Sequence, residues 1–213
     1  FIICDHHRPG DTLPLAVAVL DPKRPDCDYP FKELCGCGVG FKLAQAYHQQ
    51  YNLPFEDLVP LLDLVVVSIA ADIVPMIDEN RVLSFYGLQQ LNASPRIGLK
   101  ALMDVANRKD TFTISDVVFG LAPRINAAGR IEHGNNAVEL LVQQDFFIAK
   151  EKADYIDNHN FTRKELDKSI TQEALAMIVP DANSTVVCSE KWHKGVVGIV
   201  ASRLIETYYR PTI

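Results

Sequence analysis

The stretch Phe1-Ile2-Ile3-Cys4-Asp5-His6-His7 places three polar side chains directly after a short apolar run. The run predicts a buried strand, and open parallel sheets bind ligands in the loops that follow their strands. Carboxylate oxygens and imidazole nitrogens are suitable ligands for Mn²⁺, Mg²⁺ or Zn²⁺. Successive side chains of an extended chain point in opposite directions, so His6 and His7 should differ in role, one binding metal and the other facing substrate. The other interpretation is a solvated turn capped by Asp5, and the tripeptide alone leaves both open.

A second apolar run at residues 16–20 ends at Asp21-Pro22, and the polar turn Arg8-Pro9-Gly10-Asp11 separates the two runs. This order predicts neighbouring strands of a buried parallel sheet. Residues 58–71 are apolar on nearly all sides, which predicts a helix buried on both sides. Further helices are predicted over residues 38–51, 79–91, 97–106, 146–178 and 196–209, with a short helix through Leu121 capped by Ser115-Asp116, and strands over residues 185–188 and 210–213.

The predicted helix over residues 146–178 is charged on most faces, as is typical of a helix that bridges two domains. The sequence therefore predicts an α/β protein in three parts. A domain built on a parallel sheet occupies residues 1–145, a linking helix residues 146–180, and the beginning of a smaller α/β domain residues 181–213. Because the chain starts inside a predicted strand and lacks an initiator Met, we expect a fragment of a longer protein.

Composition narrows the class of protein. Hydrophobic residues make up 48% and charged residues 23% of the chain, which is ordinary for a soluble globular protein. No apolar run reaches the roughly 18–20 residues that span a bilayer, so we expect no membrane partner. The five cysteines have no regular spacing, which indicates reduced thiols in a cytoplasmic protein. The net charge of −6 disfavours a generally basic nucleic-acid surface, but it allows a local basic groove or carboxylates that hold cations.

Asp72 is a single carboxylate at the end of the apolar helix predicted over residues 58–71. A buried carboxylate is costly unless it is paired or bound to a cation, and an exposed one is unfavourable beside the negative end of a helix. A nearby metal ion would remove either cost. The residues alone leave the metal ligand and the exposed aspartate equally open.

Two arginines bracket the stretch Pro123-Arg124-Ile125-Asn126-Ala127-Ala128-Gly129-Arg130. The planar guanidinium group matches phosphate oxygens, and the small residues between the arginines would let a nucleic-acid strand approach. The alternative is that both arginines pair with surface carboxylates, which composition alone favours.

A glycine-containing loop at residues 192–198 leads into the helix predicted over residues 196–209. Free backbone N–H groups there, with Lys194, Ser202 and Arg203 nearby, would form an anion site. The alternative is a glycine turn packed against a sheet.

These stretches resemble, in the same order, the signature motifs of the RecJ family, the bacterial single-strand-specific 5′→3′ DNA exonucleases among the DHH phosphoesterases. Asp5-His6-His7 identifies only the DHH superfamily, whereas the arginine-bracketed stretch and Trp192-His193-Lys194-Gly195-Val196-Val197-Gly198 indicate RecJ within it. Residues 28–34, 79–81 and 210–211 fit as well. The resemblance covers essentially the whole chain.

The resemblance implies a two-metal phosphodiesterase with two Mn²⁺ (or Mg²⁺) ions between a DHH domain and a smaller DHH-associated domain joined by a long helix. It implies that His6 and Asp72 are metal ligands, that His7 faces the scissile phosphate, and that Asp5 orients the histidines. The residues implied in DNA or phosphate binding are Arg124, Asn126, Arg130, His193, Gly195, Gly198, Ser202 and Arg203. The implied substrate is single-stranded DNA with a 5′ end, in repair and recombination in the cytoplasm, with a helicase and a single-strand-binding protein as partners.

One departure from the family is expected to matter. The earlier family motifs, which supply an Asp-x-Asp pair and another aspartate ligand, precede the DHH strand, and nothing precedes Phe1 here. We therefore expect the longer parent protein to be the nuclease, and the 213-residue chain to bind metal weakly and cut nothing.

Three alternatives remain. A small-substrate DHH phosphodiesterase for nano-RNA, a cyclic dinucleotide or adenosine bisphosphate would share the tripeptide but not the stretch from Pro123 to Arg130. A catalytically inactive replication scaffold would have lost metal ligands, whereas His6 and Asp72 are kept. A plain α/β domain would need four motifs to match in order by coincidence.

Overall fold

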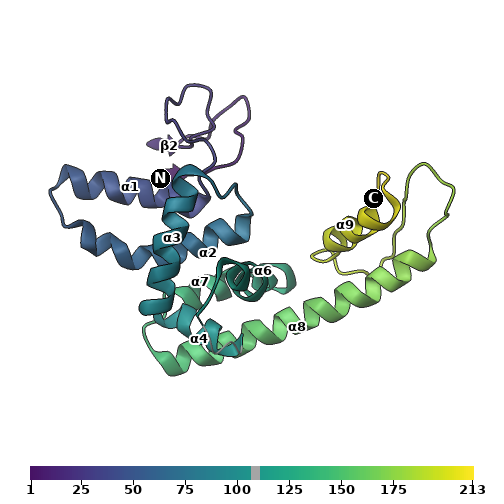
Figure 1. Ribbon diagram of the computed structural model, residues 1–213. Coiled ribbons are helices and arrows are strands. Elements are labelled where there is room, and N and C mark those ends of the chain that lie inside the picture. The colour runs from purple at the N-terminus through teal and green to yellow at the C-terminus, as the bar shows by residue number, and fades with distance from the viewer. Residues whose placement is uncertain (107–110) are drawn as a thin grey trace.

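The computed structural model describes residues 1–106 and 111–213. Figure 1 shows a mostly helical body, a long helix that leaves it, and a small C-terminal piece at the far end of that helix. The elements are β1 (Ile2–Cys4), β2 (Ala18–Leu20), α1 (Gly36–Gln50), the 3₁₀ helix η1 (Phe55–Leu61), α2 (Leu62–Asp72), α3 (Asp78–Ala93), α4 (Ile97–Val105), α5 (Ile114–Asp116), the π-helical η2 (Val117–Leu121), α6 (Ala122–Ile131), α7 (Asn135–Leu141), α8 (Phe146–Ala176) and α9 (Val197–Tyr208). The predicted α/β class, with a small parallel sheet, is confirmed.

The sheet pairs β1 with β2 in parallel, as predicted. Ile3 lies opposite Val19, and the Asp5 N–H extends the ladder by donating to the Leu20 carbonyl at 2.9 Å. Asp5 therefore stands at the carboxyl end of β1, where parallel sheets place ligand-binding loops.

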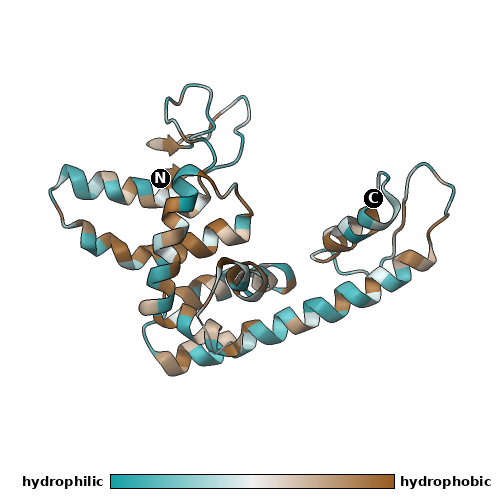
Figure 2. Ribbon diagram, viewed as in Figure 1, coloured by the Kyte–Doolittle hydropathy of each residue, from teal (hydrophilic) through white to brown (hydrophobic). Residues whose placement is uncertain are grey.

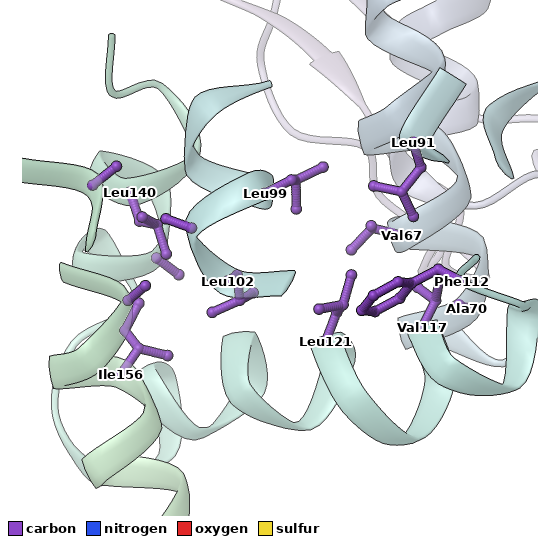
Figure 3. Packing of buried hydrophobic residues seen from close by; sticks show 14 of the residues in the cluster. Val67, Ala70, Leu91, Leu99, Leu102, Phe112, Val117, Leu121, Leu140 and Ile156 are labelled. Carbon is purple, nitrogen blue, oxygen red and sulfur yellow. The ribbon is translucent and has the colours of Figure 1, made fainter. Parts of the chain in front are cut away.

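Helix α2 lies between the two main hydrophobic cores. Its residue Ala70 belongs to a core shared with α4, η2, α6 and α8, in which Figure 3 shows Leu102, Leu121 and Ile156 gathered from three different elements. Its residue Ile69 belongs to a second core shared with α1, η1 and α3. The predicted helix buried on both sides is confirmed, and Asp72 is its last residue.

Two predicted helix starts are wrong. The helix expected over residues 58–71 begins as the 3₁₀ helix η1, which contains Pro60, and becomes α-helical only at α2; proline lacks the N–H that an α-helical interior needs. The cap expected at Ser115-Asp116 is Thr113, whose hydroxyl accepts from the Asp116 N–H while the Asp116 carboxylate accepts from the Thr113 N–H. This reciprocal pair starts the helix earlier, and η2 then carries it into α6.

Helix α8 connects the body to the C-terminal piece. It packs against α4, α6 and α7 at its start and against α9 near its end. Figure 2 shows mainly hydrophilic residues along its middle, in agreement with the predicted polar linking helix. Asp145 caps it by accepting hydrogen bonds from the N–H groups of Phe147 and Ile148. Among the described residues, no helix is long and apolar enough to cross a membrane.

The strands predicted over residues 185–188 and 210–213 are reduced to one parallel bridge between Thr185 and Thr212. Thr185 donates its N–H to Pro211 and accepts from the Ile213 N–H, both at 2.8 Å. The two segments therefore pair with each other as short neighbours, and no third described strand extends them into a ladder. A small core of Ile170, Ala174, Val196, Val200 and Leu204 holds the piece against α8.

Candidate metal and phosphate site

The Asp5 carboxylate organises the turn after β1. Its Oδ1 accepts from the His6 N–H at 2.7 Å and the His7 N–H at 3.2 Å, and it lies 2.7 Å from Nδ1 of the His7 ring. The hydrogen bond from the His7 ring is the main reason that the pKa of Asp5 is lowered to about 2, and the two backbone N–H groups act in the same direction. Asp5 therefore fixes the orientation of the His7 ring through this hydrogen bond.

His6 and Asp72 come together although they lie far apart in the sequence. Nε2 of His6 is 3.5 Å from Oδ2 of Asp72, and the two side chains are 14% and 38% exposed. Helix α2 ends at Asp72 because Ile73 adopts a left-handed conformation with φ of 54°. Nδ1 of His6 is buried and has no hydrogen-bond partner among the described residues. The carboxylate of Asp72 is therefore partly exposed to solvent beside the His6 ring.

The His6–Asp72 pair fits a divalent cation. Its nitrogen–oxygen separation is at the limit of a hydrogen bond, whereas two ligands at about 2.1 Å from one ion lie roughly 3.0–3.4 Å apart. Imidazole and carboxylate together suit Mn²⁺ and also accept Mg²⁺. In the part of the chain that the structure describes, no group of three or more His, Cys, Asp or Glu side chains forms a fuller ligand set. The pair could therefore contribute at most two ligands to such an ion.

His7 occupies the open side of the turn. Its side chain is 79% exposed, and its ring lies 4.4 Å from the His6 ring at a tilt of 53°. Alternation after β1 thus turns one histidine inward to Asp72 and the other outward, as predicted from the extended chain.

The arginine-bracketed stretch forms α6. Nε of Arg124 donates to Asp157 of α8 at 2.7 Å, and its Nη1 donates to the Gly120 carbonyl at 2.7 Å. Asn126 is exposed. The expectation that the small residues leave room for a strand is wrong for Ala127 and Ala128, because both are buried and let α6 pack closely against the body.

The loop before α9 does not offer the free N–H groups that were predicted at its glycine. The Gly195 N–H donates to Nδ1 of His193 at 3.1 Å, and the His193 carbonyl accepts from the next two N–H groups. A Cβ at Gly195 would overlap the Arg130 carbonyl oxygen, so only glycine fits there. Nη1 of Arg130 also donates to the Gly195 carbonyl at 3.3 Å. The structure thus joins two of the predicted phosphate-binding segments at one contact.

Within α9, the predicted anion-binding side chains have partners inside the protein. Ser202 donates its hydroxyl to the Gly198 carbonyl at 3.0 Å, and both residues are exposed. Arg203 binds both carboxylate oxygens of Asp167 on α8, at 3.0 and 2.8 Å. The backbone of the loop and the side chain of Arg203 are therefore fixed before any ligand binds.

Sequence reasoning missed Asp167 and Arg163, because it treated α8 only as a linker. They are four residues apart and therefore neighbours on one face of a helix, which was the available signal. The partner of Asp167, Arg203 on α9, lies too far along the chain for any local motif to reveal it.

Comparison with known proteins gives the same relationship along the entire chain. The DHH family, N-terminal domain, matches residues 1–69. The single-stranded-DNA-specific exonuclease RecJ of Bacillus subtilis (strain 168) is 45% identical over 216 residues, covering 100% of this chain and 27% of the relative. The RecJ of Escherichia coli (strain K12) is 39% identical over 230 residues, covering 100% of this chain and 40% of the relative.

Two solved structures agree. The crystal structure of RecJ in complex with Mn²⁺ from Thermus thermophilus is 33% identical, with a TM-score of 0.88 over 99% of this chain and 32% of that one. A crystal structure of exonuclease RecJ bound to manganese is 34% identical, with a TM-score of 0.87 over 99% of this chain and 53% of that one. The chain spans less than half the length of the curated relatives named above. Residues 1–69 thus match the N-terminal domain of the DHH family, and the whole chain is similar in sequence and structure to the RecJ exonucleases.

Proposed function

We propose that the protein containing this chain is a metal-dependent, single-strand-specific 5′→3′ DNA exonuclease. The observation that carries the proposal is the pairing of His6 with Asp72 beside an outward-facing His7, at the carboxyl end of β1. Homology to RecJ over the entire chain supports the same activity.

His6 and Asp72 would hold Mn²⁺ or Mg²⁺, one of two ions in the complete protein. A bound divalent cation supplies positive charge that polarises a phosphodiester and makes a bound water more acidic. His7 would meet the scissile phosphate, because Asp5 fixes its ring while most of its side chain faces solvent. Asp5 keeps its negative charge through this hydrogen bond and so holds the ring in one orientation.

The DNA strand would be bound between the body, residues 1–145, and the piece that residues 181–213 form at the end of α8. Arg130 on α6 contacts the loop before α9, and Arg203 on α9 contacts α8, so both guanidinium groups lie where these parts meet. Asn126 and Ser202, on the same two helices, are exposed. A helicase would supply the single strand and a single-strand-binding protein would coat it, because the proposed enzyme acts only on unpaired DNA. In a bacterium this substrate lies in the cytoplasm.

The test uses the full-length protein and a 5′-phosphorylated single strand labelled at its 3′ end. We expect nucleotide release with Mn²⁺ and none with EDTA. His6→Ala and Asp72→Ala should each lower the rate by more than about 100-fold, since even residues behind a metal ligand contribute about 10- to 100-fold. Asp57→Asn, at an exposed carboxylate far along the chain from both motifs, should keep the wild-type rate.

Other substrates separate the alternatives. Faster cleavage of a dinucleotide than of the long strand would favour the small-substrate phosphodiesterase, and absence of any divalent-dependent cleavage would favour the scaffold. The same assay on the 213-residue chain tests the expectation that it cuts nothing.

A further inference from the structure

Helix α8 carries polar side chains that no signature motif contains. His159 and Arg163 are neighbours one turn apart, and Asp167 follows after another turn. Asp167 is buried and binds Arg203, and Arg163 donates from Nη2 to Asn160 at 3.3 Å. The middle of α8 therefore contributes directly to the junction between α6 and α9.

Two buried nitrogen atoms on this helix lack hydrogen-bond partners among the described residues. They are Nε of Arg163 and Nδ1 of His159. A buried polar atom without a partner loses its hydration and gains nothing in return, which is destabilising. An acceptor that entered here would remove this cost at both atoms.

The junction of α6, α8 and α9 has an excess of positive charge around Arg163, which also favours an anion. The positive charges of Arg130 and Arg203 act on Arg163, and among the described residues the carboxylate of Asp167 acts on it in the opposite sense. Both oxygens of that carboxylate are already bound by Arg203. Burial is the first cause that lowers the pKa of Arg163, and repulsion from the other two arginines adds to it. An anion bound beside Arg163 would offset the repulsion from the two arginines and stabilise the charge of the buried guanidinium group.

We propose that Arg163, with His159 beside it, binds a phosphate group of the DNA strand at the junction of α6, α8 and α9. The guanidinium group presents Nε and Nη as a planar fork that matches two phosphate oxygens, and His159 can donate from Nδ1. This inference rests on the proposed function and adds to it a binding group on the linking helix. The helix thus contacts the substrate as well as spacing the two regions.

The test measures the affinity of the full-length protein for a fluorescent single strand by anisotropy, in EDTA, over a series of salt concentrations. Arg163→Gln should weaken binding about tenfold and reduce the slope of log affinity against log salt by about 0.7, the value for one phosphate contact on a single strand. Lys164→Gln removes the same charge from the neighbouring exposed position and should keep the wild-type affinity and slope. Strands with a 5′-phosphate and a 5′-hydroxyl distinguish a terminal from an internal phosphate.

Unchanged affinity in Arg163→Gln would overturn the proposal, and so would weaker binding with an unchanged salt slope, because that result assigns Arg163 a structural role. If this variant does not fold, Arg163→Lys decides: a two- to threefold loss of affinity with the wild-type slope supports the fork, and wild-type affinity contradicts it. A wild-type protein that binds no single strand contradicts the proposed function itself. Binding that Arg163→Gln leaves intact contradicts this inference alone.

Discussion

The body that precedes α8 and the piece that follows it fix their functional side chains by different means. In the body, His6 and Asp72 stand at the ends of β1 and α2, and α2 is packed between two large cores. In the C-terminal piece a small core is supplemented by polar contacts to the rest of the molecule, such as the bond from Trp192 Nε1 to Glu173 at 2.9 Å. Packing therefore positions the helix that carries Asp72, whereas hydrogen bonds and ion pairs help to position the C-terminal piece.

This difference predicts that the two regions lose stability separately. Leu102→Ala, at a fully buried position of the body, should cost about 3 kcal/mol because it leaves a cavity in the main core. Hydrogen exchange should then speed up throughout the body. Leu204→Ala, at a matched buried position of α9, should speed up exchange only in the C-terminal piece and in the end of α8 that packs against it. Equal loss of protection in both regions from either variant would show that they unfold as one unit.

The contact between Gly195 and Arg130 tests how closely the regions are joined. Gly195→Ala should cost about 1–3 kcal/mol, because the new Cβ overlaps the Arg130 carbonyl and pushes the loop away. Gly198→Ala is the control: nothing lies within 4 Å of its Cβ, and alanine should stabilise α9 by about 0.5 kcal/mol. Thermal unfolding and exchange in residues 192–209 measure both. Similar behaviour of the two variants would contradict the close contact.

The sequence predicted most of the strands and helices of the body, because their apolar residues form local patterns. Apolar runs identified β1, β2 and the doubly buried α2, although the residues of the two strands are only partly buried or exposed. The local pattern did not predict contacts between residues that lie far apart in the sequence. Thr185 pairs only because residues 211–213 return beside it, and the bond from Arg203 to Asp167 joins residues on different helices.

In the candidate site, too, local sequence identified individual residues but not the contacts between distant ones. The residues alone left a metal role for Asp72 open, and the family resemblance implied it; only the folded chain brings its carboxylate to His6. Arg163 has no motif around it, and the role proposed for it depends on charges that α6 and α9 bring to it.

Substitution of Asp167 tests whether net charge or the orientation of Arg203 matters more for binding of a single strand. Asp167→Asn should cost about 1–2 kcal/mol, less than loss of a fully buried pair, because 56% of the Arg203 side chain is exposed and can be hydrated. The variant makes the junction more positive, so charge alone predicts tighter binding of a single strand. We expect binding to weaken a few-fold instead, because Arg203 loses its fixed orientation. Tighter binding in the anisotropy assay would show that net charge decides.

The pair between Arg124 and Asp157 should have the smallest effect. Asp157→Asn removes the negative charge from the contact between α6 and α8 but keeps an acceptor oxygen, and the carboxylate is 38% exposed, so the substitution should cost no more than about 1 kcal/mol. Nη2 of Arg124 has no partner among the described residues, which leaves one edge of the guanidinium group for a phosphate. Arg124→Gln should therefore lower both stability and affinity for a single strand, whereas Asp157→Asn should lower stability alone. If the two variants change stability equally and leave affinity unchanged, Arg124 only ties α6 to α8, as the surface-pair interpretation of the sequence predicts.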